Sequence, residues 1–473
     1  MHVVKSEEWN IIRKNIVENM MFFLFLSGVG TFWNRRLIPL EIRDGSKKAK
    51  YRKILFYVLL SGIIATAVSG YFFVWRSVPS TIMLKSGVEQ QVNLHVPVSG
   101  ELYRKVIEVS GNTGTPIKQK DHSLWVDFRQ PVTMIGDQID NYTMDLKLFG
   151  VLPFKTVNVQ VIKDTMLRPA GIPIGIYVET DGILVVGIGS FEDEIGQIQE
   201  PGKNILQPGD YILEVNEQCV ESKKALIDRI DHCEGQPLVF KVRRGENELE
   251  VKAQPKMNQN GEYKMGIWVR DNAQGVGTMT YVDEQGNFGA LGHGINDVDT
   301  SMLMTLGDGK LYHTEIIGIT RGGSGRPGEL TGYIEYDDRN IMGTIEENNV
   351  RGIFGNCSEE TQGGITSDFM EVALKQDICI GPAQIISTVD GERKYYDVEI
   401  VDLNLQNDNI NRGIVLQVTD EELLATTGGI VQGMSGSPII QNGKLVGAVT
   451  HVLVRDASKG YGIFIEEMLN VTG

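Results

Sequence analysis

The sequence predicts a mainly β, multidomain protein with an N-terminal transmembrane helix. One uncharged apolar run occupies residues 54–75 and is the only stretch suited to crossing a bilayer. After Thr81, short runs that alternate apolar and polar residues recur between clusters of Gly, Pro, Asn and Asp, which is typical of strands and turns. The 473 residues exceed the usual length of one domain, so we expect several units with separate cores.

The apolar run and its flanks predict a membrane orientation. At 1.5 Å per residue, its 22 residues cross a hydrocarbon core of about 30 Å. Residues 1–53 hold 11 lysines and arginines against five acidic residues, and such positive flanks stay in the cytoplasm. We therefore predict a cytoplasmic basic segment (1–53), a transmembrane anchor (54–75) and an extracytoplasmic remainder. A cleaved signal peptide is the alternative, because Ala65-Thr66-Ala67 has the small-residue pattern of a cleavage site.

Net charge and cysteine content exclude several classes of function. The formal charge is −16 although residues 1–53 are basic, so the remainder is strongly acidic and unsuited to binding nucleic acid. The cysteines lack CxxC spacing and are too few for a disulfide framework. HExxH and phosphate-binding loop motifs are also absent, and we therefore expect no metal or organic cofactor. The four cysteines are Cys219, Cys233, Cys357 and Cys379.

Residues 76–165 are predicted to form a small β-rich unit. Stretches such as "EQQVNLHV" and "TVNVQVI" alternate with period two and are separated by turn residues. Its two histidines, His95 and His122, stand singly within predicted strands. We expect them to be structural.

Residues 166–255 are predicted to form an α+β module of strands, a Gly209-Asp210 turn, one helix and two further strands. The stretch "PGDYILEVN" resembles the hallmark of PDZ domains, which bind extended peptides by adding a strand to a sheet edge. The alternative is a module that only packs against its neighbour. The resemblance implies a carboxylate-binding loop formed by Pro173, Ile174, Gly175 and Ile176.

Residues 256–473 are rich in glycine and short strands, as in a barrel or double barrel, and contain a candidate nucleophile. In "QGMSGSPIIQNGKLVGAVTH", Ser435 lies between glycines and precedes a predicted Asn442-Gly443 hairpin. A nucleophilic serine needs a base, a group that orients the base, and donors for the oxyanion. The N–H groups of Gly433 and Ser435 are the expected donors. Ser324, in "RGGSGRPGE", is a weaker candidate because no strand pair frames it.

Three histidines of this region are candidates for the base. His293 follows an apolar run and lies between glycines, as a histidine presented at a strand end should. His451 lies on the strand after Ser435, where alternation favours a core position. His313 lies in a mixed polar strand. We therefore predict His293 as the general base.

Three stretches of this region resemble the stage IV sporulation protein B family of membrane-anchored serine peptidases. They are "GVGTMTYVDEQGNFGALGHGINDVDT", "GGIVQGMSGSPIIQNGKLVGAVTHV" and "GYGIFIEEML". The resemblance extends over roughly residues 165–470 and includes the PDZ-like module. It implies a chymotrypsin-like double β-barrel peptidase domain over residues 256–473.

The resemblance also implies a catalytic triad of His293, Asp420 and Ser435. Asp420 is its least secure member, because Thr419-Asp420-Glu421-Glu422 reads equally well as the start of a helix. The carboxylates of Asp297 and Asp299, shortly after His293, are the alternatives.

The family implies a role in sporulation. Such a peptidase cleaves its own N-terminal region and then a regulator of a membrane-embedded protease, which activates a late mother-cell sigma factor. The implied location is the space between the mother-cell and forespore membranes, with release after self-cleavage. A non-catalytic anchored PDZ adaptor with a relic peptidase barrel is the alternative.

Overall fold

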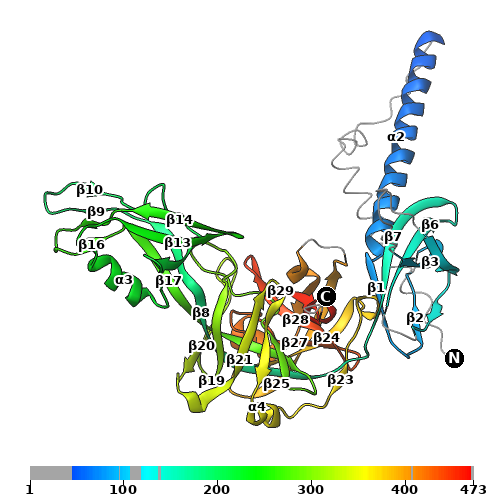
Figure 1. Ribbon diagram of the computed structural model, residues 1–473. Helices are drawn as coiled ribbons and strands as arrows, with labels where there is room; N and C mark the ends of the chain where they lie inside the picture. Colours follow the sequence, from blue (N-terminus) through cyan, green and yellow to red (C-terminus); the bar gives the residue numbers. More distant parts are fainter. Residues whose placement is uncertain (1–44, 95, 107–118, 137–139, 406–408, 470–473) are drawn as a thin grey trace. The chain divides into compact units, whose positions relative to one another are not determined.

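The computed structural model describes residues 45–94, 96–106, 119–136, 140–405 and 409–469 (Figure 1). Most of the predicted basic segment, residues 1–44, and His95 lie outside the described residues. The chain divides into two compact units, Met1–Phe72 and Phe73–Gly473.

The first unit contains most of helix α2 (Gly45–Ser77). Within the described residues, its stretch Arg52–Ser77 is the one helix long and apolar enough to cross a membrane. Large apolar side chains along it are exposed, among them Tyr57 and Phe73. The predicted anchor is therefore a helix with the length and composition of a membrane span.

The β-rich unit that begins the second compact unit is a five-stranded sheet in the order β1-β7-β6-β3-β4. Strand β1 pairs in parallel with β7, and the other neighbours are antiparallel. A separate pair, β2 with β5, completes a buried core that includes Ile82, Phe128 and Met144. The strands are β1 (Thr81–Lys85), β2 (Gln90–Val92), β3 (Val98–Val106), β4 (Gln119–Asp127), β5 (Val132–Met134), β6 (Asn141–Leu148) and β7 (Leu152–Ile162).

A small α+β module follows, with its own core around Phe240, Leu226 and Ile212. Buried Asp210 accepts two hydrogen bonds of 2.7 Å from the Arg244 guanidinium, which ties the predicted Gly-Asp turn to the sheet. The module contains β9 (Phe191–Glu192), β10 (Ile198–Gln199), β11 (Tyr211–Val215), β12 (Gln218–Cys219), α3 (Lys223–Asp231), β13 (Leu238–Arg244), β14 (Asn247–Ala253), β15 (Lys256–Met257) and β16 (Tyr263–Lys264).

Six strands form a closed circuit of pairing, here called the first circuit. Its order is β8-β17-β18-β22-β21-β19, and β19 pairs back with β8. Phe288, Leu311 and Ile353 are buried inside it. Its strands are β8 (Met166–Ile188), β17 (Ile267–Val282), β18 (Asn287–Ala290), β19 (Leu306–Thr320), β21 (Ile341–Asn349) and β22 (Gly352–Cys357); β20 (Glu329–Ile334) pairs with β19 outside it, and η2 (Asp338–Asn340) and α4 (Glu359–Gly364) flank β21 and β22.

The C-terminal strands close into a second barrel in the order β24-β25-β26-β29-β28-β27. Its core contains Ile385, Leu416 and Ile439. The elements of this region are β23 (Met370–Glu371), η3 (Lys375–Asp377), β24 (Gly381–Thr388), β25 (Arg393–Leu403), η4 (Ile410–Arg412), β26 (Ile414–Val418), α5 (Glu421–Thr427), β27 (Pro438–Gln441), β28 (Lys444–Leu453), β29 (Asp456–Phe464) and α6 (Ile465–Leu469).

The strand pairing differs from the predicted boundary at residues 255/256. Strands β8 and β17 run side by side through both the module and the first circuit (Figure 1). Their inner parts, Thr180 and earlier in β8 and Asn272 and later in β17, belong to the circuit, and their outer parts belong to the module. The module is therefore inserted between two strands of the first circuit. The composition of the sequence did not reveal this insertion, because the 23-residue strand β8 has no turn or linker at the point where it passes from one core to the other.

Candidate active site

A cavity of about 490 Å³ lies where the first circuit meets the second barrel. Residues from β17 and the segment after β18 line one side, and the segment before β27 and the end of β28 line the other. Ser435, His293 and His451 all line it. The cavity therefore brings together the predicted base, which follows a strand of the first circuit, and the predicted nucleophile, which precedes a strand of the second barrel.

The turn that carries Ser435 is shaped by glycines and held by backbone bonds. Gly433 and Gly436 have φ values of 95° and 99°, in the left-handed region. A Cβ on Gly436 would lie 1.9 Å from the carbonyl oxygen of Thr278, so only glycine fits there. The Thr278 N–H donates to the Ser435 carbonyl oxygen at 2.9 Å, and the Thr278 hydroxyl donates to the Gly433 carbonyl oxygen at 2.8 Å. These bonds join the turn to β17.

The two expected oxyanion donors are available. Among the residues that the structure describes, no hydrogen-bond acceptor receives the backbone N–H of Gly433 or of Ser435. Both residues line the cavity. Unpaired N–H groups at such a place can stabilise negative charge on a substrate oxygen.

The Ser435 hydroxyl is held by the neighbouring strand. Its Oγ donates to the Thr450 carbonyl oxygen at 2.6 Å. The serine is only half-buried, so a rotation about χ1 is enough to point the hydroxyl elsewhere in the cavity. The hydroxyl therefore donates its hydrogen bond to the backbone and not to a histidine.

His293 is presented by a sharp turn after β18. Leu291 and Gly292 have φ values of 68° and 70°, and such a conformation costs a leucine roughly 1 kcal/mol. Its Nδ1 lies 3.0 Å from the Gly294 carbonyl oxygen. Burial lowers the pKa of His293 below its ordinary value. The imidazole is thus neutral at pH 7, and with Nδ1–H donating to Gly294, Nε2 is the nitrogen that accepts a proton.

Two asparagine side chains fix the His293 turn. Asn348 accepts the Ile295 N–H at 2.8 Å and donates to the carbonyl oxygens of Ile295 and Met304. Asn411 donates to the Gly292 carbonyl oxygen at 2.6 Å. His293 is therefore positioned through side-chain amides on both sides.

His451 is a site residue that sequence reasoning placed in the core. Its ring centroid lies 4.8 Å from that of His293, with an angle of 36° between the planes. Partial burial, together with the nearby His293 and Arg412, lowers the pKa of His451 to about 4. The hairpin predicted at Asn442-Gly443 carried the signal, because it returns β28 past the serine turn, where the Ser435 hydroxyl donates to the carbonyl oxygen of Thr450, the residue before His451.

The structure does not bring Asp420 to this cavity. Asp420 is the N-cap of α5: its carboxylate accepts the Leu423 N–H at 2.9 Å and the Asp397 N–H at 3.2 Å. Asn411, which contacts the His293 turn, precedes β26, whereas Asp420 follows it. Strand β26, with five residues roughly 16 Å long at about 3.3 Å per residue, runs between them. The helix-start interpretation of this segment is the one that the structure bears out.

The alternative acids, Asp297 and Asp299, also do not line the cavity. Both form ion pairs of 2.6 Å with Arg270. Asp297 is buried and further accepts the Thr300 hydroxyl at 2.9 Å. Their carboxylates are thus engaged in holding the segment after His293 to β17.

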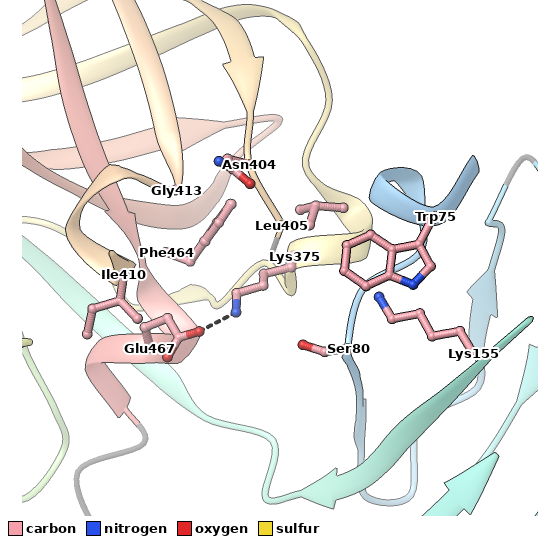
Figure 2. Close-up of a pocket in the computed structure, with 10 residues that line it drawn as sticks. All are labelled: Trp75, Ser80, Lys155, Lys375, Asn404, Leu405, Ile410, Gly413, Phe464 and Glu467. Carbon is pink, nitrogen blue, oxygen red and sulfur yellow. Dashed lines mark hydrogen bonds and ion pairs between the residues drawn. The ribbon is translucent and has the colours of Figure 1, made fainter. Parts of the chain in front are cut away.

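The rival serine and histidine lie outside the site. Ser324 is exposed and its hydroxyl donates to the Arg455 carbonyl oxygen at 3.2 Å. His313 is exposed on β19. A second cavity, drawn in Figure 2, has Lys375 paired with Glu467 and contains neither a histidine nor Ser435.

The predicted PDZ carboxylate loop is wrong. Pro173, Ile174, Gly175 and Ile176 lie inside β8, with β17 paired on one side and β19 on the other. A strand hydrogen-bonded on both edges has no free N–H groups for a peptide carboxylate. The resemblance to PDZ domains implied a loop at these residues, but they lie in a strand of the first circuit.

The sequence model of the SpoIVB peptidase S55 family matches residues 261–469. The match covers a little less than half of the chain. The S55 match includes Ser435 and His293 and confirms the predicted resemblance, although it begins after β8. S55 peptidases are serine peptidases, so the match supports proteolysis by this region.

Other comparisons add little to the S55 match. No curated protein matches the chain at a significant level. Among solved structures, the PDZ domain of an SdrC-like protein from Listeria monocytogenes is similar at 22% identity, over 20% of this chain and 90% of that one, with a TM-score of 0.17. A score this low carries no argument about the fold, and the PDZ-like nature of the module stays a prediction.

Proposed function

We propose that this chain is a membrane-anchored serine endopeptidase in which Ser435 is the nucleophile and His293 the general base. The observation that carries the proposal is their meeting in one cavity between the first circuit and the second barrel, beside the free N–H groups of Gly433 and Ser435. The first circuit and the second barrel, each of six strands, support a chymotrypsin-like double barrel. The apolar helix Arg52–Ser77 supports the anchor.

In the proposed mechanism, Ser435 Oγ attacks the scissile carbonyl carbon as its proton passes to Nε2 of His293. The carbonyl oxygen becomes negative and is stabilised by the N–H groups of Gly433 and Ser435. His293 then gives the proton to the leaving amine as the C–N bond breaks. A water molecule attacks the resulting ester by the same path, which releases the acid and restores the serine hydroxyl.

For the physiological role, we propose a sporulation signalling peptidase that cleaves its own N-terminal region and a regulator of a membrane-embedded protease. The proposed site of action is the space between the mother-cell and forespore membranes. The match to the S55 family supports this role. The PDZ-like module, inserted beside the catalytic region, is suited to presenting these protein substrates.

The test uses the full-length protein in detergent. Ser435→Ala should abolish both self-cleavage and labelling by a fluorophosphonate, a probe that reacts with activated serines. Ser324→Ala is the matched control, because that serine is also flanked by glycine, and it should behave as the wild type. Self-cleavage that persists in Ser435→Ala would sink the assignment.

A non-catalytic adaptor is the second candidate, and one observation favours it. The Ser435 hydroxyl is bonded to the Thr450 carbonyl oxygen, and no carboxylate of Asp420, Asp297 or Asp299 reaches the cavity. An adaptor would leave Ser435 unlabelled while the chain still binds peptides. The same fluorophosphonate experiment therefore separates the two functions.

A further inference from the structure

We propose that His451 is a positioning residue of this site, which packs against the His293 ring, orients it toward Ser435 and keeps water from its outer face. This inference rests on the proposed function. It assigns to a second histidine the orienting role that the family resemblance implied for Asp420.

The two imidazoles are in direct contact within the cavity. Their centroids are 4.8 Å apart and their planes are tilted by 36°, which is close packing for two five-membered rings. Both rings and Ser435 line the same cavity. The contact limits the directions in which the His293 ring can turn.

The strand pairing fixes His451 at this place. On the β27–β28 hairpin, Ala448 faces Pro438, and the Val449 N–H donates to the Ser437 carbonyl oxygen at 2.9 Å. The Gly436 N–H donates in turn to the Val449 carbonyl oxygen at 2.7 Å. The Ser435 hydroxyl donates to the Thr450 carbonyl oxygen at 2.6 Å, so the serine lies beside the residue that precedes His451. The histidine is therefore placed by the same hairpin that presents the nucleophile.

The surroundings of His451 favour an uncharged ring. His293 contacts it on one side, Arg412 of η4 lies near it, and Tyr461 is its pairing partner on β29. The Arg412 guanidinium lies over the Tyr461 ring at 5.0 Å. The Arg412 cation disfavours a proton on His451. His451 thus acts by shape and by excluding water, and not as a counter-ion to the imidazolium.

The experiment measures the rate of fluorophosphonate labelling of the full-length protein between pH 5 and 9. His451→Ala should slow labelling at pH 7 by at least about tenfold, because the His293 ring is no longer held. It should also move the acid limb of the pH profile upward, since a hydrated His293 regains a pKa near the ordinary value of about 6.5. His451→Phe keeps a ring in place and should stay within about threefold of the wild type.

His313→Ala is the matched control, because His313 is exposed outside the cavity, and it should label like the wild type. Thermal unfolding verifies that each variant is folded. Labelling of His451→Ala within twofold of the wild type, or an acid limb that does not move, would overturn the inference. A folded His451→Phe variant that is labelled as slowly as His451→Ala would also overturn the inference. Failure of the proposed function has a different signature, since the wild-type Ser435 would then take no label at all.

Discussion

The two sides of the cavity hold their functional residue by different means. On the serine side, the turn is held by backbone bonds from β17 and β28 and by glycines that exclude any side chain. On the histidine side, the turn is held by the side chains of Asn348 and Asn411 and by the ring of His451. The proposed nucleophile is therefore held mainly by the backbone, whereas the proposed base depends on side chains that a single substitution can remove.

The largest effect should come from Gly436→Ala on the serine side. The new methyl group meets the Thr278 carbonyl oxygen at 1.9 Å in a backbone conformation that alanine avoids. We expect a loss of about 3 kcal/mol in the free energy of unfolding and no labelling of Ser435. Urea denaturation measures the first and fluorophosphonate reaction the second.

Gly443→Ala is the control for Gly436→Ala, because Gly443 has φ 75° but no atom within 4 Å of its Cβ position. It should cost only about 1 kcal/mol, from backbone strain alone. Equal losses in the two variants would show that the contact with Thr278 is unimportant.

On the histidine side, Asn348→Ala should leave the protein folded but reduce the rate at which Ser435 is labelled. The change removes three hydrogen bonds to Ile295 and Met304 and frees the turn that carries His293. We expect labelling to fall by about tenfold or more. Asn356→Ala, an exposed asparagine of the same circuit, should leave the rate unchanged. Equal rates for both variants would contradict the contrast between the two sides.

Substitutions of Asp420 test whether this residue, which lies outside the cavity, contributes to either side of the site. As a helix N-cap, Asp420→Asn should keep both stability and labelling, because asparagine caps as well as aspartate. Asp420→Ala should lose about 1 kcal/mol of stability with a nearly normal rate. If Asp420 were the triad acid, Asp420→Asn would abolish labelling while the protein stayed folded.

The smallest effect concerns stability at acidic pH. Burial lowers the pKa of His293, and burial with its charged neighbours lowers the pKa of His451 to about 4. Both are neutral in the folded chain and take up protons in the unfolded chain below about pH 6.5. Stability should therefore decline as the pH falls from about 6.5 toward 4.

Urea midpoints at pH 7 and pH 5 measure this decline. His451→Gln should reduce the difference between the two midpoints, because one histidine no longer titrates. His313→Gln is the control and should leave the difference as it is, since His313 is exposed. A decline unchanged by His451→Gln would mean that other groups account for it.

Local sequence patterns predicted Ser435 and His293 as candidates. The positions of the other candidate residues depend on the pairing of strands that lie far apart in the sequence. Ser435 and His293 could be predicted because glycine turns and strand ends are visible within a few residues. His451 was missed because its place depends on a bulged hairpin register. Asp420 had a local alternative as a helix cap, and that alternative describes where it lies.

The fold shows the same division. The mainly β character and the apolar helix followed from periodicity and length. The insertion of the module, and the place of Pro173 and Ile176 inside a strand, depend on β8 pairing with β17 and β19. Sequence composition does not specify which strands become neighbours.

The continuity of β8 decides how this protein can be divided for expression. A fragment that starts at residue 261, where the family match begins, would lack the strand that closes the first circuit. Strands β17 and β19 would then present open edges, which promote aggregation between copies. The smallest soluble peptidase should therefore begin before Met166 and carry the inserted module with it.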